Sequence, residues 1–75
     1  MTLTARIQSI ENGITLNPAD NYEYELNALS GTESDLPVYR YMGTPVYKIV
    51  QAKEDIARIR AWILAEIEHN KLNAE

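Results

Sequence analysis

Residues 52–72, AKEDIARIRAWILAEIEHNKL, carry the strongest periodic signal in the chain. Isoleucines recur in this stretch at spacings of three or four residues, at positions 56, 59, 63 and 67. This spacing places them on one side of an α-helix, and Ala52 extends the same stripe. We therefore predict a long helix from about Ala52 to Leu72, with its isoleucine face packed into the core.

A second side of this helix also carries apolar residues. Trp62 points roughly 110° away from the isoleucine stripe. The residues that share its side are Arg58, Ala65 and His69. The central turn, residues 61–65, is apolar all round, and a helix of that kind is normally buried. Two interpretations stay open: Trp62 closes the edge of the domain's own core, or this side packs on another protein or on a second copy of the chain.

Two near copies of a short apolar run precede this helix. Pro37-Val38-Tyr39-Arg40 and Pro45-Val46-Tyr47-Lys48 lie eight residues apart, with Gly43 between them. Because proline suits the start of a strand and glycine supplies a turn, this segment predicts a β-hairpin over about 37–50. Tyrosine and arginine commonly anchor protein interfaces. The hairpin is therefore a candidate binding surface, through Tyr39, Arg40, Tyr41 and Tyr47.

Residues 3–12 and 18–29 are compatible with either a helix or a strand. In the first segment the apolar residues fit one helical stripe, whereas Asn12-Gly13 is also a hairpin signal. In the second, residues 22–26 alternate as a strand would, but Asn17-Pro18 is typical of a helix start. The overall prediction is one small α+β domain spanning residues 1–75, in which the hairpin or a short antiparallel sheet packs against the C-terminal helix.

Charge is unevenly distributed along the chain. The 75 residues have a formal net charge of -4 at pH 7. Residues 1–36 hold six acids against one base, whereas residues 37–60 hold five bases against two acids. The blocks either neutralise one another at a solvated surface or form an acidic face for a basic partner. That face would consist of Asp20, Glu23, Glu25, Glu33 and Asp35.

A nucleic-acid partner is the weaker prediction, because phosphates repel an acidic chain. Such a partner would be contacted by the cations in the second half of the sequence, which are Arg40, Lys48, Lys53, Arg58 and Arg60.

The residue types that catalysis and cofactor binding require are scarce. The sequence has no cysteine, which excludes disulfides, thiol catalysis and cysteine zinc sites. It has one histidine, His69, so a Ser-His-Asp triad or a multi-histidine metal site cannot form within one chain. Glu66 and His69 have the spacing of di-metal carboxylate helices, but such sites need several helices of this kind. We expect no catalysis, no cofactor, no metal and no small-molecule substrate.

Together these features predict a non-catalytic protein-binding module, a small acidic adaptor or inhibitor that docks on a larger protein. Small acidic domains without cysteine are common products of viruses and mobile elements, including inhibitors of host defence systems, so a role of that kind is expected by association. A structural or assembly subunit of a homo-oligomer is the alternative, and a nucleic-acid-associated regulator is a second one. No apolar run reaches the ~20 residues of a membrane span, so we expect no membrane partner and a cytoplasmic location, the host cytoplasm for a viral protein.

Overall fold

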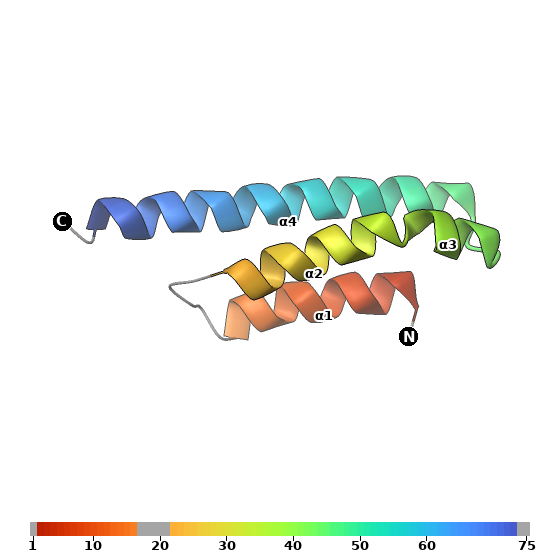
Figure 1. Cartoon of the computed structure of the whole chain (residues 1–75), viewed down its shortest axis with the longest axis horizontal. Helices are drawn as coiled ribbons and strands as arrows, with labels where there is room; N and C mark the ends of the chain where they lie inside the picture. The colour runs from red at the N-terminus through yellow and green to blue at the C-terminus, as the bar shows by residue number, and fades with distance from the viewer. Residues whose placement is uncertain (1, 17–21, 74–75) are drawn as a thin grey trace.

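The computed structural model describes residues 2–16 and 22–73, and these residues form four α-helices joined by short connections (Figure 1). In chain order the helices are α1 (Leu3–Leu16), α2 (Glu23–Ser34), α3 (Leu36–Tyr41) and α4 (Val46–Asn73). No strand is present in these residues, so the predicted α+β fold is wrong and the described chain is all-α.

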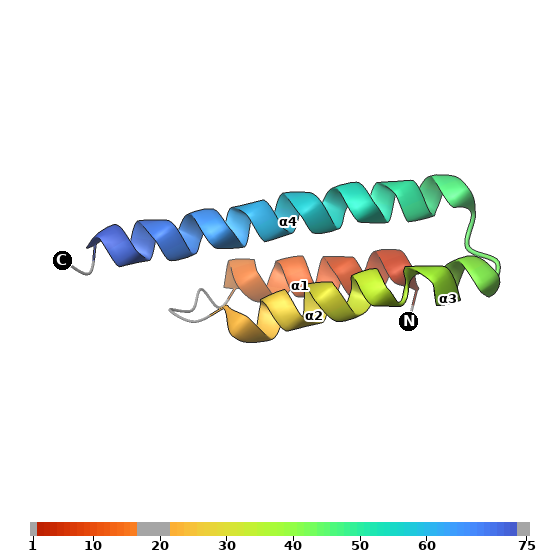
Figure 2. The same ribbon diagram turned by 45° about the horizontal axis from the view of Figure 1, so that its top comes forward.

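The helices form an elongated bundle in which α4 lies along both α1 and α2 (Figures 1 and 2). α2 runs antiparallel to α1, α3 continues in the direction of α2, and α4 runs back along them. The 28 residues of α4 span about 42 Å at 1.5 Å per residue, close to the 48 Å length of the molecule. At one end the last turns of α4 extend past α1 and α2. At the other end α3 and the first turns of α4 extend past the start of α1.

The isoleucine stripe of α4 fills the centre of the bundle. Ile56, Ile59 and Ile63 are fully buried, and Ile67 is partly buried against the same core. Ala52 and Ile49 extend this buried stripe toward the start of the helix. α4 accordingly begins at Val46 and not at the predicted Ala52. The buried apolar residues of the whole core are Leu3, Ile7, Ile14, Tyr22, Leu29, Leu36, Ile49, Ala52, Ile56, Ile59 and Ile63.

α1 is a helix, which decides the first alternative left by the sequence. The side-chain oxygen of Thr2 accepts a hydrogen bond from the backbone N–H of Ala5 at 3.1 Å, as an N-cap does. The helix then continues through Asn12-Gly13 instead of turning there. Its apolar residues at spacings of three and four face the core, so the helical stripe outweighs the local hairpin signal.

α2 is also a helix, although residues 22–26 alternate like a strand. Tyr22 is buried and Tyr24 is 80% exposed, because positions two apart point to nearly opposite sides of a helix as well as of a strand. The next buried residue on this side is Leu29, seven positions after Tyr22, which fits the helical period. The predicted helix start at Asn17-Pro18 lies outside the described residues.

The segment predicted as a β-hairpin, residues 37–50, is a short helix, a corner and the start of α4. Pro37 lies in the first turn of α3, and Pro45 directly precedes α4. Each proline therefore begins a helix and not a strand, because its fixed φ and its missing N–H both suit a first helical turn. The two Pro-Val-Tyr runs are too short for their own periodicity to distinguish these outcomes.

Gly43 makes the corner between α3 and α4. Its φ is 105°, a conformation that glycine adopts without steric cost. The N–H of Gly43 donates to the carbonyl of Arg40 at 3.2 Å, and the N–H of Thr44 donates to the carbonyl of Tyr39 at 3.0 Å. These two bonds form the Schellman motif that closes the C-terminal end of a helix. Glycine thus supplies the turn that the sequence placed here, but at a helix end.

Three ion pairs connect different segments of the bundle. One joins α1 to the junction of α2 and α3, one joins α1 to α4, and one joins α2 to α4. Exposed pairs of this kind contribute about 0–1 kcal/mol each, so they fix the relative placement of the helices more than they stabilise the fold. The pairs are Arg6–Asp35 at 2.8 Å, Glu11–Arg58 at 2.8 Å and Glu33–Arg60 at 3.4 Å.

We predict that alanine has opposite effects at two of the glycines. Gly43→Ala should lower the free energy of unfolding by about 1 kcal/mol or more, because a side chain at a φ of 105° is strained. Gly13 lies inside α1, and an added Cβ there meets no atom within 4 Å. Gly13→Ala should therefore stabilise the protein by about 0.5–1 kcal/mol. Urea unfolding followed by circular dichroism measures both changes, and a shift of the same sign in both variants would contradict the assigned corner.

Candidate protein-binding surface

Six large apolar side chains lie exposed around the corner between α3 and α4. Their exposed fractions range from 49% to 90%. Tyr24 and Leu64 are also exposed to this extent, but they lie on other parts of the bundle. We name the six residues the corner patch, and they are Val38, Tyr41, Met42, Val46, Tyr47 and Val50.

The corner patch is exposed because the bundle has fewer helices at this end. α3 and the first turns of α4 extend beyond the start of α1 (Figures 1 and 2), so these two helices pack mainly on each other there. One residue of α3, Leu36, is fully inside the core, and Ile49 is the first buried residue of α4. Their neighbours on the outer sides of the two helices therefore face solvent.

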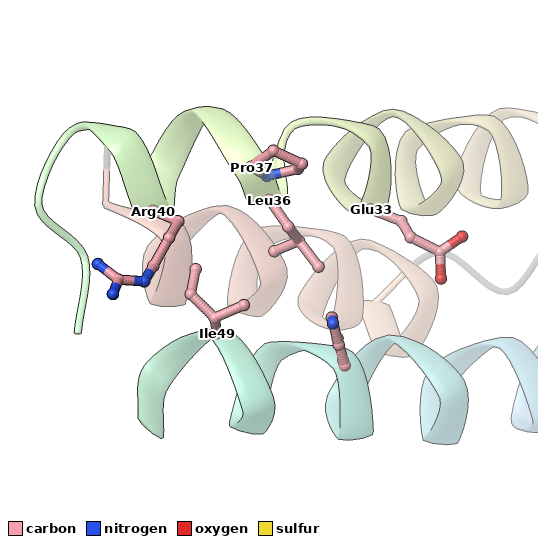
Figure 3. A pocket seen from close by; sticks show the side chains of 6 residues that line it. Glu33, Leu36, Pro37, Arg40 and Ile49 are labelled. Carbon is pink, nitrogen blue, oxygen red and sulfur yellow. The ribbon is translucent and has the colours of Figure 1, made fainter. Parts of the chain in front are cut away.

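A hollow of about 440 Å³ opens between α3 and α4 beside the corner patch (Figure 3). Its floor is apolar, because Leu36 points from α3 toward α4 and Ile49 points back from α4 toward α3. These two side chains belong to residues that are only 3% and 9% exposed. The remaining lining residues are exposed and form the rim, which consists of Glu33, Pro37, Arg40 and Lys53.

The charges at the rim of the hollow do not cancel. Arg60 donates two hydrogen bonds to the carboxylate of Glu33, each at 3.4 Å, so the one acid of the rim is already matched by a base. Neither Arg40 nor Lys53 forms an ion pair or a side-chain hydrogen bond with any residue that the structure describes. The rim therefore carries two positive charges in a chain whose net charge is -4.

The structure separates the four residues predicted to form the hairpin surface. Tyr41 and Tyr47 belong to the corner patch, and Arg40 lies beside them at the hollow. Tyr39 instead packs against the core, where Arg6 donates a hydrogen bond to its hydroxyl oxygen at 3.4 Å. On a strand Tyr39 and Tyr41 would share one face, but on the helix α3 they point to different sides.

The predicted Trp62 face is used partly within the molecule itself. Trp62 is partly buried against the core, and Arg58 binds Glu11 of α1 at 2.8 Å. Ala65 and His69 remain exposed on this side of α4. The interpretation in which Trp62 closes the edge of the domain's own core therefore accounts for Trp62 itself, while Ala65 and His69 remain exposed.

The predicted acidic face is not one surface. Glu23 and Glu25 lie in the first turn of α2, where carboxylates are favoured by the helix dipole. Glu33 lies in the last turn of α2 and Asp35 just after it, each paired with an arginine of another helix. Asp20 lies outside the described residues.

Sequence reasoning missed the aliphatic part of the corner patch and the hollow beside it. The missing signal is the register of the isoleucine stripe. Continued backward from Ile56 by steps of four and three, the stripe reaches Ala52 and Ile49, which makes residues 46–51 part of the same helix. The residues that were not predicted as part of the site are Val38, Met42, Val46, Val50, Leu36 and Ile49.

Metal sites and membrane spans were sought among the described residues. No three side chains of histidine, aspartate or glutamate there are grouped so that they could hold a metal ion. None of the four described helices combines the length and the apolar character that crossing a membrane requires. Comparison of the chain with protein-family models, with curated proteins and with solved structures found no match in any of the three.

The ion pair between Glu11 and Arg58 predicts a pH dependence of stability. The hydrogen bond from Arg58 lowers the pKa of the Glu11 carboxyl below its ordinary value of 4.5. A carboxyl whose pKa is lower in the folded state stabilises the fold above its unfolded pKa and loses that contribution as the pH falls through the folded pKa. Glu11→Gln should therefore destabilise the protein at neutral pH by about 0.2–1 kcal/mol, with the difference vanishing in acid.

Unfolding of the native chain and of Glu11→Gln by urea over a series of pH values measures this difference. Glu54→Gln is the matched control, because no partner of the exposed Glu54 is found among the described residues. A difference between the native chain and Glu11→Gln that persists well below pH 4.5 would mean that the ion pair is not its source.

The packing of Trp62 on the core predicts that its truncation acts on stability. Trp62→Ala should lower the free energy of unfolding by about 2 kcal/mol, since a partly buried aromatic ring leaves a partial cavity. The neighbouring Leu64 is 53% exposed, and Leu64→Ala should cost about 0.5 kcal/mol or less. Thermal unfolding of the two variants measures both losses of stability. If Trp62→Ala is as stable as the native chain, Trp62 does not contribute to the core and is again a candidate for contact with a partner.

Proposed function

We propose that this protein is a non-catalytic protein-binding module, of the adaptor or inhibitor kind, that docks on a larger protein through the corner patch. The observation that carries this proposal is the exposure of six large apolar side chains, between 49% and 90%, around one end of the bundle. Single exposed apolar residues are common on soluble domains, but six of them within residues 38–50 are a local concentration of the kind that interaction sites have.

The residue types of the corner patch suit a protein interface. Tyr41 is 90% exposed and Tyr47 is 70% exposed, and tyrosine combines a large apolar ring with a polar end at low entropic cost. Met42 adds a flexible side chain that adapts to uneven partner surfaces. Arg40 stands at the edge of the patch, where a charged residue can select the partner.

The backbone under the corner patch is well supported. The Schellman bonds of Gly43 and Thr44 fix the angle between α3 and α4, and Leu36 and Ile49 attach both helices to the core. A partner would therefore meet a surface whose shape exists before binding.

A protein partner accounts for the surface better than a nucleic acid does. Of the five cations expected to contact phosphates, Arg58 and Arg60 form ion pairs with Glu11 and Glu33. Of the remaining three, Arg40 and Lys53 line a hollow whose floor is apolar, and phosphates do not need an apolar floor. A second copy of the chain, as in the homo-oligomer alternative, would have to bury this same patch.

The experiment that tests the proposal is site-specific photo-crosslinking in the cell that produces the protein. A benzophenone amino acid replaces Tyr41 or Tyr47 in two variants, and Tyr24 in a matched control that is 80% exposed on α2. We expect both corner variants to crosslink to the same partner protein and the Tyr24 variant not to do so. Mass spectrometry identifies the crosslinked partner.

Affinity measurements with that partner complete the test. Tyr41→Ser and Tyr47→Ser should each weaken binding by about tenfold or more and leave the unfolding midpoint unchanged, because exposed side chains contribute little to stability. Crosslinks of the chain to itself would instead support the homo-oligomer. Crosslinking patterns that do not differ between the corner positions and Tyr24 would contradict the proposal.

A further inference from the structure

We propose that the hollow between α3 and α4 receives an apolar side chain from an acidic segment of the partner protein, whose carboxylates bind Arg40 and Lys53. This inference rests on the proposed function, since it specifies the chemistry of the partner that the corner patch would bind.

The hollow has the size and lining of a binding cleft. Its volume of about 440 Å³ lies within the roughly 300–1,000 Å³ of typical ligand clefts. Leu36 and Ile49 form an apolar floor, and the rim residues are open to solvent (Figure 3). An aliphatic or aromatic side chain placed there would pack against Leu36 and Ile49.

The unpaired cations of the rim specify the charge of the segment. Arg40 projects from α3 toward α4 beside Ile49 (Figure 3), and Lys53 lines the hollow from α4. The rim acid, Glu33, is held by two hydrogen bonds from Arg60 and leaves these two cations uncompensated. Docking a partner over them would desolvate two positive charges, which is costly unless carboxylates take the place of water.

The surroundings of the hollow indicate a protein segment and not a small amphiphilic anion. Pro37 and Tyr41 lie one helical turn apart on α3, and Val46 and Val50 lie one turn apart on α4. All four residues are exposed, and Pro37 lines the hollow itself. A fatty acid would fill the hollow and leave these side chains in water, whereas a polypeptide would cover both.

The test is a selection from a displayed library of amphipathic helical peptides. Their apolar positions vary among leucine, isoleucine and phenylalanine, and their polar positions vary freely among glutamate, glutamine and lysine. We expect peptides selected on the native chain to be enriched in glutamate over lysine. On the double variant Arg40→Glu/Lys53→Glu the preference should reverse to lysine, and an acidic peptide should bind it about tenfold more weakly or worse.

A matched control separates local from overall charge. Lys48→Glu/Lys71→Glu changes two other exposed lysines of α4, neither of which lines the hollow, and gives the same net charge. This variant should select acidic peptides as the native chain does. Methyl NMR of Leu36 and Ile49 should show shifts when a selected acidic peptide is added to the native chain.

Other outcomes overturn the inference in distinguishable ways. Selected peptides without a charge preference, or a preference unchanged by Arg40→Glu/Lys53→Glu, would exclude the acidic segment and leave the proposed protein binding in place. Methyl shifts caused by laurate without any selected peptide would assign the hollow to a small amphiphile. Shifts that grow with the concentration of the chain alone would assign it to a second copy. An absence of both selected peptides and corner-specific crosslinks would remove the inference together with the proposed function.

Discussion

Burial of one isoleucine face of α4 by two other helices at once is the interaction on which the whole bundle depends. α1, α2 and α3 have 14, 12 and 6 residues, and isolated helices of such lengths are marginal in water. They persist because Ile56, Ile59 and Ile63 supply a continuous apolar surface for α1 and α2. With no cysteine in the chain, this single core has no covalent support.

The different lengths of the helices determine where apolar surface is left over. α4 is twice as long as α1, so it cannot be covered along its whole length by a helix of that size. At the corner end α3 takes part of this role, but its six residues bring only Leu36 fully into the core. The corner patch lies on α3 and the first turns of α4, which extend past the start of α1, and the hollow opens between these two helices. The candidate site is thus a direct consequence of the architecture.

Local sequence signals predicted the long helix but failed in the segment before it. The isoleucines of α4 repeat over several turns, and a pattern of that length excludes a strand. The two Pro-Val-Tyr runs, each counted with the basic residue that follows, hold only four residues. Proline suits the first turn of a helix as well as the start of a strand, so these runs do not distinguish the two. Tertiary packing decided between them, because Ile49 and Leu36 reach the core only if both runs are helical.

The same error explains which residues of the candidate site could be predicted. Tyr41, Tyr47 and Arg40 were identified by residue type alone, and that criterion does not depend on secondary structure. Tyr39 was grouped with them because a strand would place it beside Tyr41, and the hollow was not foreseeable because it exists only between two helices. Tyr22 and Tyr24 would alternate in burial on a helix as well as on a strand, so their pattern could not distinguish the two structures.

The corner at Gly43 also bears on the entropy of association. Its two Schellman bonds, together with the prolines that begin α3 and α4, restrict the backbone on both sides of the turn. Loops that order only upon binding lose conformational freedom at that moment, and this loss subtracts from affinity. A surface carried on two helix ends with a locked turn has already lost that freedom during folding. The backbone at this corner would therefore lose little further conformational entropy if a partner bound to it.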